Sequence, residues 1–165
     1  MRTMLFGALA TALAYGAPAR AEGDPAALAA QMKGVKVTLE KGLTAAASKG
    51  KPISGKFELE DGKLQLSIYT AKGSAYSEVI VNHRTGKVMK AEPITGGDDL
   101  TAAKAQAEAM GAAKTPLAAA VRKAVNANKG YRAVSVTPSL KDGHPSADVA
   151  LLKGTETKSV TEPLD

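Results

Sequence analysis

The chain has 165 residues, of which 4% are aromatic, and its formal net charge at pH 7 is +6. Because it contains no cysteine, it has no disulfide, no thiolate metal site, no cysteine nucleophile and no cysteine for lipid attachment. Nucleic-acid binding is disfavoured, because such proteins concentrate basic residues in a patch interleaved with aromatic residues, whereas this chain spreads its basic residues and has no tryptophan.

The N-terminus has the three parts of a secretory signal peptide, which we assign to residues 1–21. Arg2 supplies the positive start, Met4 to Ala14 is largely apolar, and Ala19-Arg20-Ala21 is an A-x-A cleavage site. The apolar run is shorter than the roughly 20 residues of a membrane span, and no later stretch is long enough. We therefore expect a periplasmic or secreted protein that begins at Glu22 and is soluble after cleavage near Ala21.

Two short helices are expected next. Asp24-Pro25 forms an N-cap followed by proline at the first helical position, and this helix ends near Gly34. Thr38 caps a second helix, with Leu39 and Leu43 on its apolar face.

The apolar period then changes from helical to alternating, as in strands with one buried face. Asp61-Gly62 and the Arg84-Thr85-Gly86 stretch supply turns, since glycine adopts positive φ easily. Lys87 to Ile94 completes a predicted four-stranded antiparallel meander.

The second part of the chain repeats this order. Asp99 is predicted to cap an alanine-rich helix that runs to about Met110, and Thr115-Pro116 to begin a second helix. Three strands are expected after it, with Asp142-Gly143 as the turn between the first two; they cover residues 131–138, 146–152 and 156–161.

Matching positions in the two parts indicate an internal duplication. Lys49-Gly50 corresponds to Lys129-Gly130 at an offset of 80 (129 − 49), and Asp61-Gly62 to Asp142-Gly143 at an offset of 81 (142 − 61). The predicted fold class is therefore α+β. We expect two tandem modules, residues 22–95 and 96–165, each with one or two short helices packed on a three- or four-stranded antiparallel meander sheet.

The first part resembles a PepSY module in two places. Residues 37–46, VTLEKGLTAA, resemble the short helix of that family, and residues 78–88, EVIVNHRTGKV, look like its closing hairpin. The family pattern has aspartate, threonine and glycine where this chain has Asn82, Thr85 and Gly86; asparagine can make the same local turn bond. Residues 96–165 lack this hairpin, so the second module is expected to be a truncated copy.

The resemblance implies a helix packed on an antiparallel sheet and a non-enzymatic role. Inhibition or restraint of secreted peptidases is proposed for such modules, because they occur in the propeptides of thermolysin-like proteases. A tandem arrangement of helices and sheet is also similar in outline to the secreted inhibitor protein of β-lactamases, although fold alone does not fix function.

Motifs for catalysis, metals or cofactors are not found. His83 and His144 fall in predicted turns outside any zinc-binding pattern, so a metal site would need ligands brought together from distant positions. Glu58 and Glu60 alternate with apolar residues and are expected on the solvent face of a sheet rather than as an acid and base pair. We therefore predict no catalytic, cofactor-binding or metal-binding residues.

Three functional hypotheses remain. The first is a protein-binding or peptidase-inhibitory module that uses a sheet face or a strand edge; Tyr69, Tyr76 and Lys72 form its predicted partner surface. The second is an envelope-associated protein that binds anionic polymers or lipid headgroups through lysines, namely Lys51, Lys56, Lys72, Lys87 and Lys90. The third is an enzyme of unrecognised type.

Overall fold

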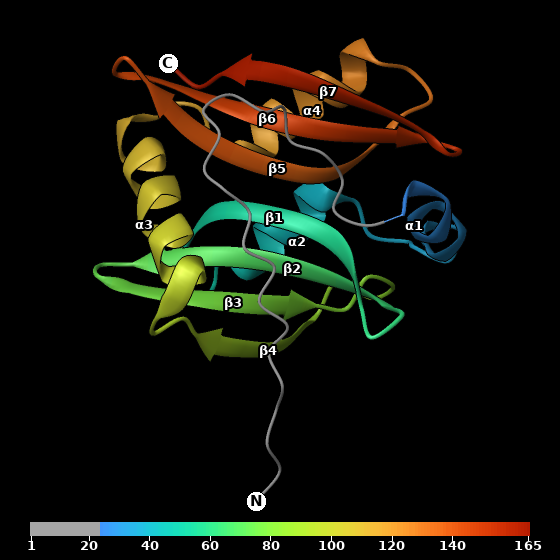
Figure 1. Cartoon of the computed structure of the whole chain (residues 1–165), viewed down its shortest axis with the longest axis horizontal. Helices are drawn as coiled ribbons and strands as arrows, with labels where there is room; N and C mark the ends of the chain where they lie inside the picture. Colours follow the sequence, from blue (N-terminus) through green and yellow to red (C-terminus); the bar gives the residue numbers. More distant parts are fainter. Residues whose placement is uncertain (1–23) are drawn as a thin grey trace, which may run out of the picture.

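The computed structural model describes residues 24–165, so the predicted signal peptide and its cleavage site lie outside the described residues. These residues form an α+β fold with four helices and one seven-stranded antiparallel sheet, which confirms the predicted fold class (Figure 1). Over the same residues, no helix has both the length and the apolar character needed to cross a membrane.

Along the described chain, two helices and four strands are followed by two more helices and three strands. The helices are α1 Pro25–Met32, α2 Leu39–Ala46, α3 Gly97–Ala112 and α4 Leu117–Ala127. The strands are β1 Lys51–Glu60, β2 Lys63–Lys72, β3 Ala75–Val81, β4 Val88–Pro93, β5 Arg132–Lys141, β6 His144–Lys153 and β7 Glu156–Pro163.

The sheet has the strand order β4-β3-β2-β1-β5-β6-β7, so two meanders share a single sheet. They meet where β1 pairs with β5, and the registered pairs are few: Gly55 lies opposite Val136, and Lys56 opposite Ser135. Sequence patterns predicted both meanders but not this junction, because alternation within a strand carries no information about a neighbour that lies far away in the chain.

Local side-chain bonds explain where the first two helices begin. The Asp24 carboxylate accepts a hydrogen bond from the backbone of Ala26 at 3.0 Å, and the Thr38 hydroxyl accepts one from the backbone of Lys41 at 3.4 Å. Both N-caps were predicted from the sequence, and both satisfy N–H groups that have no partner within the helix.

The predicted caps of the later two helices were wrong. Helix α3 begins at Gly97, its N-cap is Gly96, and Asp99 lies inside the first turn without a capping bond. Helix α4 has Pro116 rather than Thr115 at its N-cap. An acidic side chain in the first turn is favourable by its charge alone, so Asp99 suits a helix start without being the cap.

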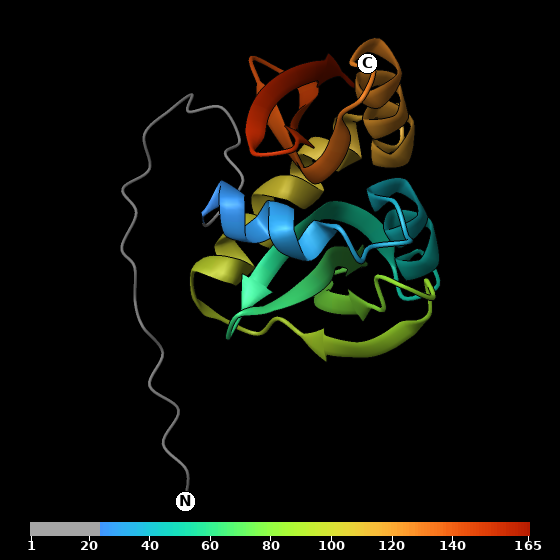
Figure 2. The same cartoon turned by 90° about the vertical axis from the view of Figure 1, so that its right-hand side faces the viewer.

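Helices cover both faces of the sheet. Helices α2 and α4 lie side by side on one face, and α3 crosses the other face (Figures 1 and 2). Figure 1 shows α1 at the side of the molecule away from α3. Leu39 and Leu43 of α2, Val121 of α4, Ile68 of β2 and Val149 of β6 all belong to one hydrophobic cluster. A single continuous core therefore extends across the junction of the two meanders.

Strand lengths and a bulge of the first meander recur in the second meander at a constant distance along the sequence. Strands β1 and β5 have ten residues each, as do β2 and β6, and the later strand of each pair begins 81 positions after the earlier one (132 − 51 and 144 − 63). The register of β1 shifts between Pro52 and Ser54, and that of β5 between Ala133 and Ser135, again 81 positions apart (133 − 52).

The same spacing appears in backbone hydrogen bonds. The carbonyl oxygen of His83 accepts bonds from the backbone of Lys36 at 3.0 Å and of Val37 at 3.1 Å. The carbonyl oxygen of Leu164, 81 positions after His83 (164 − 83), accepts bonds from the two residues that precede Pro116, at 2.8 and 3.0 Å. In both places the segment that enters the second helix is fastened to the end of the third strand of its meander.

Candidate functional site

The structure brings together two of the three residues of the predicted partner surface. Tyr69 lies opposite Glu78, and Tyr76 lies opposite Ala71, so the two tyrosines share one sheet face and both are partly buried. Lys72 is exposed at the end of β2, three positions after Tyr69, so the alternation of side chains turns it toward the opposite face.

A polar cluster surrounds Tyr69 on the face that α3 crosses. The buried Ser67 hydroxyl donates to a carboxylate oxygen of Glu58 at 2.7 Å, and the Lys56 ammonium lies 2.8 Å from the other oxygen of the same carboxylate. Lys56 also lies 6.0 Å from the centre of the Tyr69 ring, and the Tyr69 hydroxyl donates to Glu78 at 3.5 Å. These contacts hold the side chains of β1, β2 and β3 in one network.

Burial raises the pKa values of Tyr69 and Glu78, the two titratable groups at the centre of this cluster. It raises the pKa of Tyr69, against the opposing effect of the Lys56 charge. Burial also raises the pKa of Glu78, while the polar Ser67 side chain opposes that shift. Asp99 in the first turn of α3 adds a smaller upward contribution to both pKa values, which places the helix start near the cluster.

The expectation that Glu58 is a solvated residue was wrong. Its side chain is 17% exposed and is held by Lys56 and Ser67, whereas Glu60 is exposed as expected. The physical reason is α3, which crosses the face that alternation alone marks as solvent. The two glutamates therefore lie in different environments.

The hairpin between β3 and β4 has a compact set of bonds around Asn82. The Asn82 side-chain oxygen accepts from the backbone of Arg84 and of Thr85, both at 2.9 Å, and its carbonyl oxygen accepts from Gly86 at 2.8 Å. Gly86 has a φ of 75°, a conformation that glycine adopts without strain. Asn82, Thr85 and Gly86 thus build a turn, and they lie away from the tyrosine cluster in sequence and in register.

The two histidines are far apart in the fold. His83 follows β3, and its Nδ1 atom is buried without a hydrogen-bond partner; burial and the Arg84 charge lower its pKa. His144 is exposed at the start of β6, 3.8 Å from a carboxylate oxygen of Asp165. Over residues 24–165, no three His, Asp or Glu side chains are grouped so that they could hold a metal ion.

A groove of about 390 Å³ lies between α1 and the turn that joins β6 to β7. Small and apolar side chains line most of it, and Arg132 and Lys33 contribute positive charge. Its lining residues are Ala26, Ala29, Ala30, Met32, Lys33, Arg132, Leu152, Gly154 and Thr155. A second hollow, of about 80 Å³, is also lined by Arg132, together with residues that include Tyr131 and Phe57.

Two basic residues that sequence analysis did not single out for this role fasten helices to the sheet. Lys51, the first residue of β1, donates to the carbonyl oxygen of Met110 near the end of α3. Arg132, the first residue of β5, donates to the carbonyl oxygens of Met32 at 3.1 Å and Val35 at 3.4 Å. The sequence feature that could have identified these two residues as a pair is their spacing of 81 positions (132 − 51).

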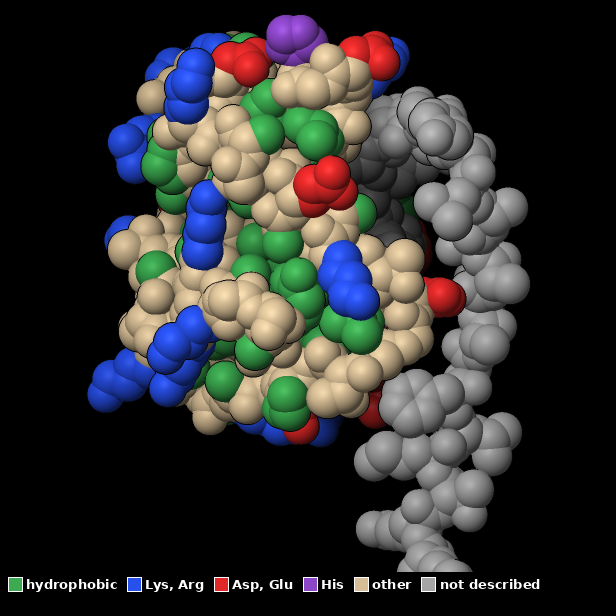
Figure 3. Space-filling view, turned by 90° about the vertical axis from the view of Figure 1, so that its left-hand side faces the viewer, with side chains coloured by type: hydrophobic (Ala, Val, Ile, Leu, Met, Phe, Trp, Pro, Cys, Tyr) green, Lys and Arg blue, Asp and Glu red, His purple; other side chains and the backbone are tan. Residues whose placement is uncertain are grey.

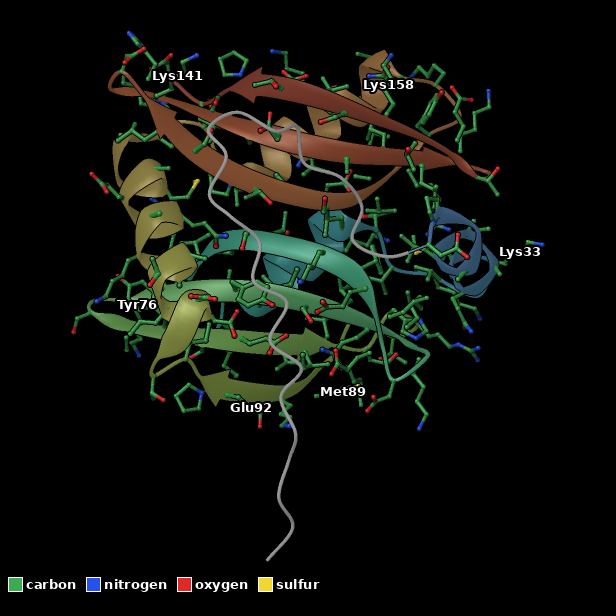
Figure 4. All side chains as sticks on the ribbon, in the orientation of Figure 1. Lys33, Tyr76, Met89, Glu92, Lys141 and Lys158 are labelled. Carbon is green, nitrogen blue, oxygen red and sulfur yellow. The ribbon has the colours of Figure 1, made fainter. Side chains whose placement is uncertain are left out.

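The sheet ends on two strands of different character, β4 and β7. Figure 4 shows them at opposite ends, with Met89 and Glu92 on β4 and Lys158 on β7. Strand β4 has six residues, a register shift next to Met89 and a proline at its end, which are features that limit pairing with another strand. Strand β7 has eight residues and pairs with β6 in an unbroken register.

Comparison with known proteins adds no relative: no family model, no curated protein and no solved structure matches the chain.

Proposed function

We propose that the protein is an exported, non-catalytic binding protein built from two PepSY-like modules, residues 22–95 and 96–165. The repeated spacing of 81 supports the duplication, because it holds for strand starts, for bulges and for the bonds to His83 and Leu164. An unrelated pair of meanders would share strand alternation but would have no reason to share these irregularities.

The PepSY assignment is supported by the hairpin that follows β3. The side chain of Asn82 accepts two backbone hydrogen bonds, which is the turn-closing part that the family's aspartate would play. Among residues 24–165, the second meander has no strand equivalent to β4.

The proposed activity is the binding of a protein partner, with a secreted or periplasmic peptidase as the leading candidate. The observation that carries it is the open end of the sheet at β7, where the first module has another strand and the second has none among residues 24–165. Strand addition to such an edge gives affinity through backbone hydrogen bonds, and it requires no catalytic group.

Binding of anionic polymers through lysines has less support. Of the five lysines in that hypothesis, Lys51 bonds to Met110, Lys56 pairs with Glu58, and Lys90 lies 2.7 Å from a carboxylate oxygen of Glu92. On the side drawn in Figure 3, Lys and Arg side chains are spread from top to bottom among polar and apolar groups. Scattered charges of this kind bind polyanions weakly and lose binding in salt.

The test begins with the mature chain, residues 22–165, immobilised and exposed to periplasmic extract of the source cell at low and high salt. Captured peptidases are identified by mass spectrometry, purified and assayed with increasing amounts of the mature chain. Saturable inhibition by direct binding supports the proposal. Capture of polymers alone, reversed by salt and without effect on peptidases, contradicts it and favours the lysine hypothesis.

The proposed export has its own test. The N-terminal sequence of the protein isolated from the periplasm or medium of the source cell is expected to begin at Glu22, after removal of residues 1–21. A protein that keeps Met1 and stays in the cytoplasm contradicts the signal peptide assignment.

A further inference from the structure

We infer that the free edge of β7 is the docking strand of this protein, and that it receives an extended, acidic segment of a protein partner in the place that β4 occupies on β3. This inference rests on the proposed binding function and deepens it by naming the edge, the geometry and the chemistry of the occupant.

The first step is the equivalence of β7 and β3. The two strands begin 81 positions apart (156 − 75), and each is the third strand of its meander. Strand β4 pairs antiparallel with residues 77–81 of β3. The corresponding residues of β7 are 158–162, and their outer side borders no other strand in the described sheet. The chain itself therefore shows how a strand fits this edge.

The second step is the direction of the backbone groups of β7. Leu164 donates to Pro145 at 2.9 Å, and inward and outward bonding alternates along an antiparallel strand. It follows that Thr157, Ser159 and Thr161 direct their N–H and C=O groups away from β6. The side chains of these three residues are exposed, so three donors and three acceptors are open to an incoming strand.

The β4 edge offers fewer backbone groups to an incoming strand. On β4, Ile94 donates to Tyr76 at 2.9 Å, so the same alternation leaves Ala91 and Pro93 facing outward. Proline has no N–H to donate, and the register shift lies beside Met89. Short, bulged and proline-bearing edges resist pairing, which favours β7 over β4.

Charge complementarity indicates an acidic occupant. The chain from 113 to 131, which contains α4, has four basic residues and no Asp or Glu, and α4 packs along β7. Because β7 itself carries Glu156, Lys158 and Glu162, the two segments together have five basic and two acidic residues. Its Lys123 side chain is 66% exposed and reaches Glu162 at 2.7 Å, while Lys158 of β7 donates to the neutral side chain of Asn128 at 2.6 Å. An acidic side chain opposite Val160 or Glu162, on the α4 side, would lie near Lys123 and Lys158.

Charge disfavours one register of a second copy of the chain on this edge. Antiparallel pairing of two β7 strands about Ser159 places Glu156 of one copy opposite Glu162 of the other, since both lie three positions from Ser159. Like charges directly opposite one another destabilise a strand pair. Pairing about Val160 instead places Lys158 opposite Glu162, so a second copy stays an outcome of the test. The basic residues beside the edge assign the occupant to a different, acidic protein.

The experiment uses random ten-residue peptides displayed on phage and selected on the immobilised mature chain. The most enriched peptide is synthesised, and its Kd is measured by calorimetry against the unchanged chain, Ser159→Pro and the matched control Ala91→Pro. Each substitution removes one outward N–H, from β7 or from β4, and leaves the inward bonds in place. Circular dichroism and melting curves establish that both variants fold.

We expect enrichment of peptides with Asp or Glu and a Kd that rises with salt. Ser159→Pro is expected to weaken binding about fivefold or more, as for the loss of one backbone hydrogen bond, and Ala91→Pro to leave it within about twofold. Should Ser159→Pro not fold, peptides methylated at successive backbone nitrogens replace it, and weakening at every second position is the expected result.

Three outcomes would overturn the inference. Binding that Ser159→Pro leaves unchanged, or that Ala91→Pro abolishes, places the peptide elsewhere while the proposed binding function stands. A concentration-dependent dimer in sedimentation that Ser159→Pro removes assigns the edge to a second copy. If no peptide is enriched and no peptidase is bound, the proposed function fails together with the inference.

Discussion

The guanidinium group of Arg132 donates a 3.1 Å hydrogen bond to the carbonyl oxygen of Met32, the last residue of α1. The partners are 100 residues apart in the chain, so the contact ties the first helix to the second meander. The Lys51 bond to Met110 ties α3 to the first meander in the corresponding way. The first residue of β1 thus bonds to the end of α3, and the first residue of β5 bonds to the end of α1. A positive charge at a helix end also interacts favourably with the negative end of the helix dipole.

Removing this link is expected to loosen α1. Arg132→Met keeps most of the side-chain length but loses the donors, and we predict a loss of about 1 kcal/mol in the free energy of unfolding. Amide exchange of α1 should accelerate more than exchange in β6. Lys141→Met, at an exposed strand end, serves as the control. Unchanged exchange in α1 would show that the bond does not hold the helix.

Gly55 is required by the close packing at the junction of the meanders. A Cβ atom there would lie 2.7 Å from Cδ1 of Ile68 and 3.3 Å from Cδ2 of Leu43, both buried residues. Gly55→Ala is therefore predicted to destabilise the protein by about 1 to 3 kcal/mol through overpacking. The matched change Gly111→Ala, in α3 with open space around it, should stabilise by about 0.5 to 1 kcal/mol. Chemical denaturation measures both, and equal effects would contradict the packing argument.

Two substitutions at Asn82 test whether the turn requires asparagine itself or only a side chain that accepts hydrogen bonds. Asn82→Ala removes the acceptor of two backbone bonds and is predicted to cost about 1 to 2 kcal/mol. Asn82→Asp keeps an acceptor in the same place and supplies the residue of the family pattern, so it should cost much less. Denaturation curves of the two variants give the comparison. An alanine variant as stable as the aspartate variant would remove the turn from the argument for a PepSY-like hairpin.

The raised pKa of Glu78 predicts a specific pH dependence. The folded protein holds this proton more tightly than the unfolded chain does, so ionised Glu78 costs stability at neutral pH. The cost is relieved as pH falls through the raised pKa toward 4.5, the ordinary value. Glu78→Gln, which keeps an acceptor, should therefore be more stable than the unchanged chain at pH 7 and gain nothing below pH 4.5.

Melting temperatures of the Glu78→Gln variant across this pH range, with Glu60→Gln as the exposed control, test the prediction. Lys56, Glu58 and Asp99 are the charged groups that act on Glu78, so salt should reduce their part of the effect and leave the part that arises from burial. A gain that grows as the pH falls would contradict the assigned direction of the shift.

Local signals in the sequence were sufficient for most of the secondary structure. The caps at Asp24 and Thr38 and the turns at Asp61-Gly62 and Asp142-Gly143 depend on residues a few positions apart, and the structure has them as predicted. The first residues after those turns also begin β2 and β6.

Features that depend on long-range packing were not predicted. The β1–β5 junction and the roles of Lys51 and Arg132 join residues more than 50 positions apart. The path of α3 across the second sheet face also depends on contacts between elements that are not neighbours in the chain. Alternation marked Glu58 as solvated, since a strand pattern cannot show which helix will cover its polar face. The docking edge of β7 also becomes evident only once the order of strands is known.

The most direct test of the account is amide hydrogen exchange of the mature chain, measured by NMR with and without a saturating amount of the selected acidic peptide. Strand addition at β7 predicts new protection of Thr157, Ser159 and Thr161 and little change at Lys158 and Val160, whose N–H groups already face β6. Protection that spares β7, or that appears at Ala91 on β4, would contradict the account.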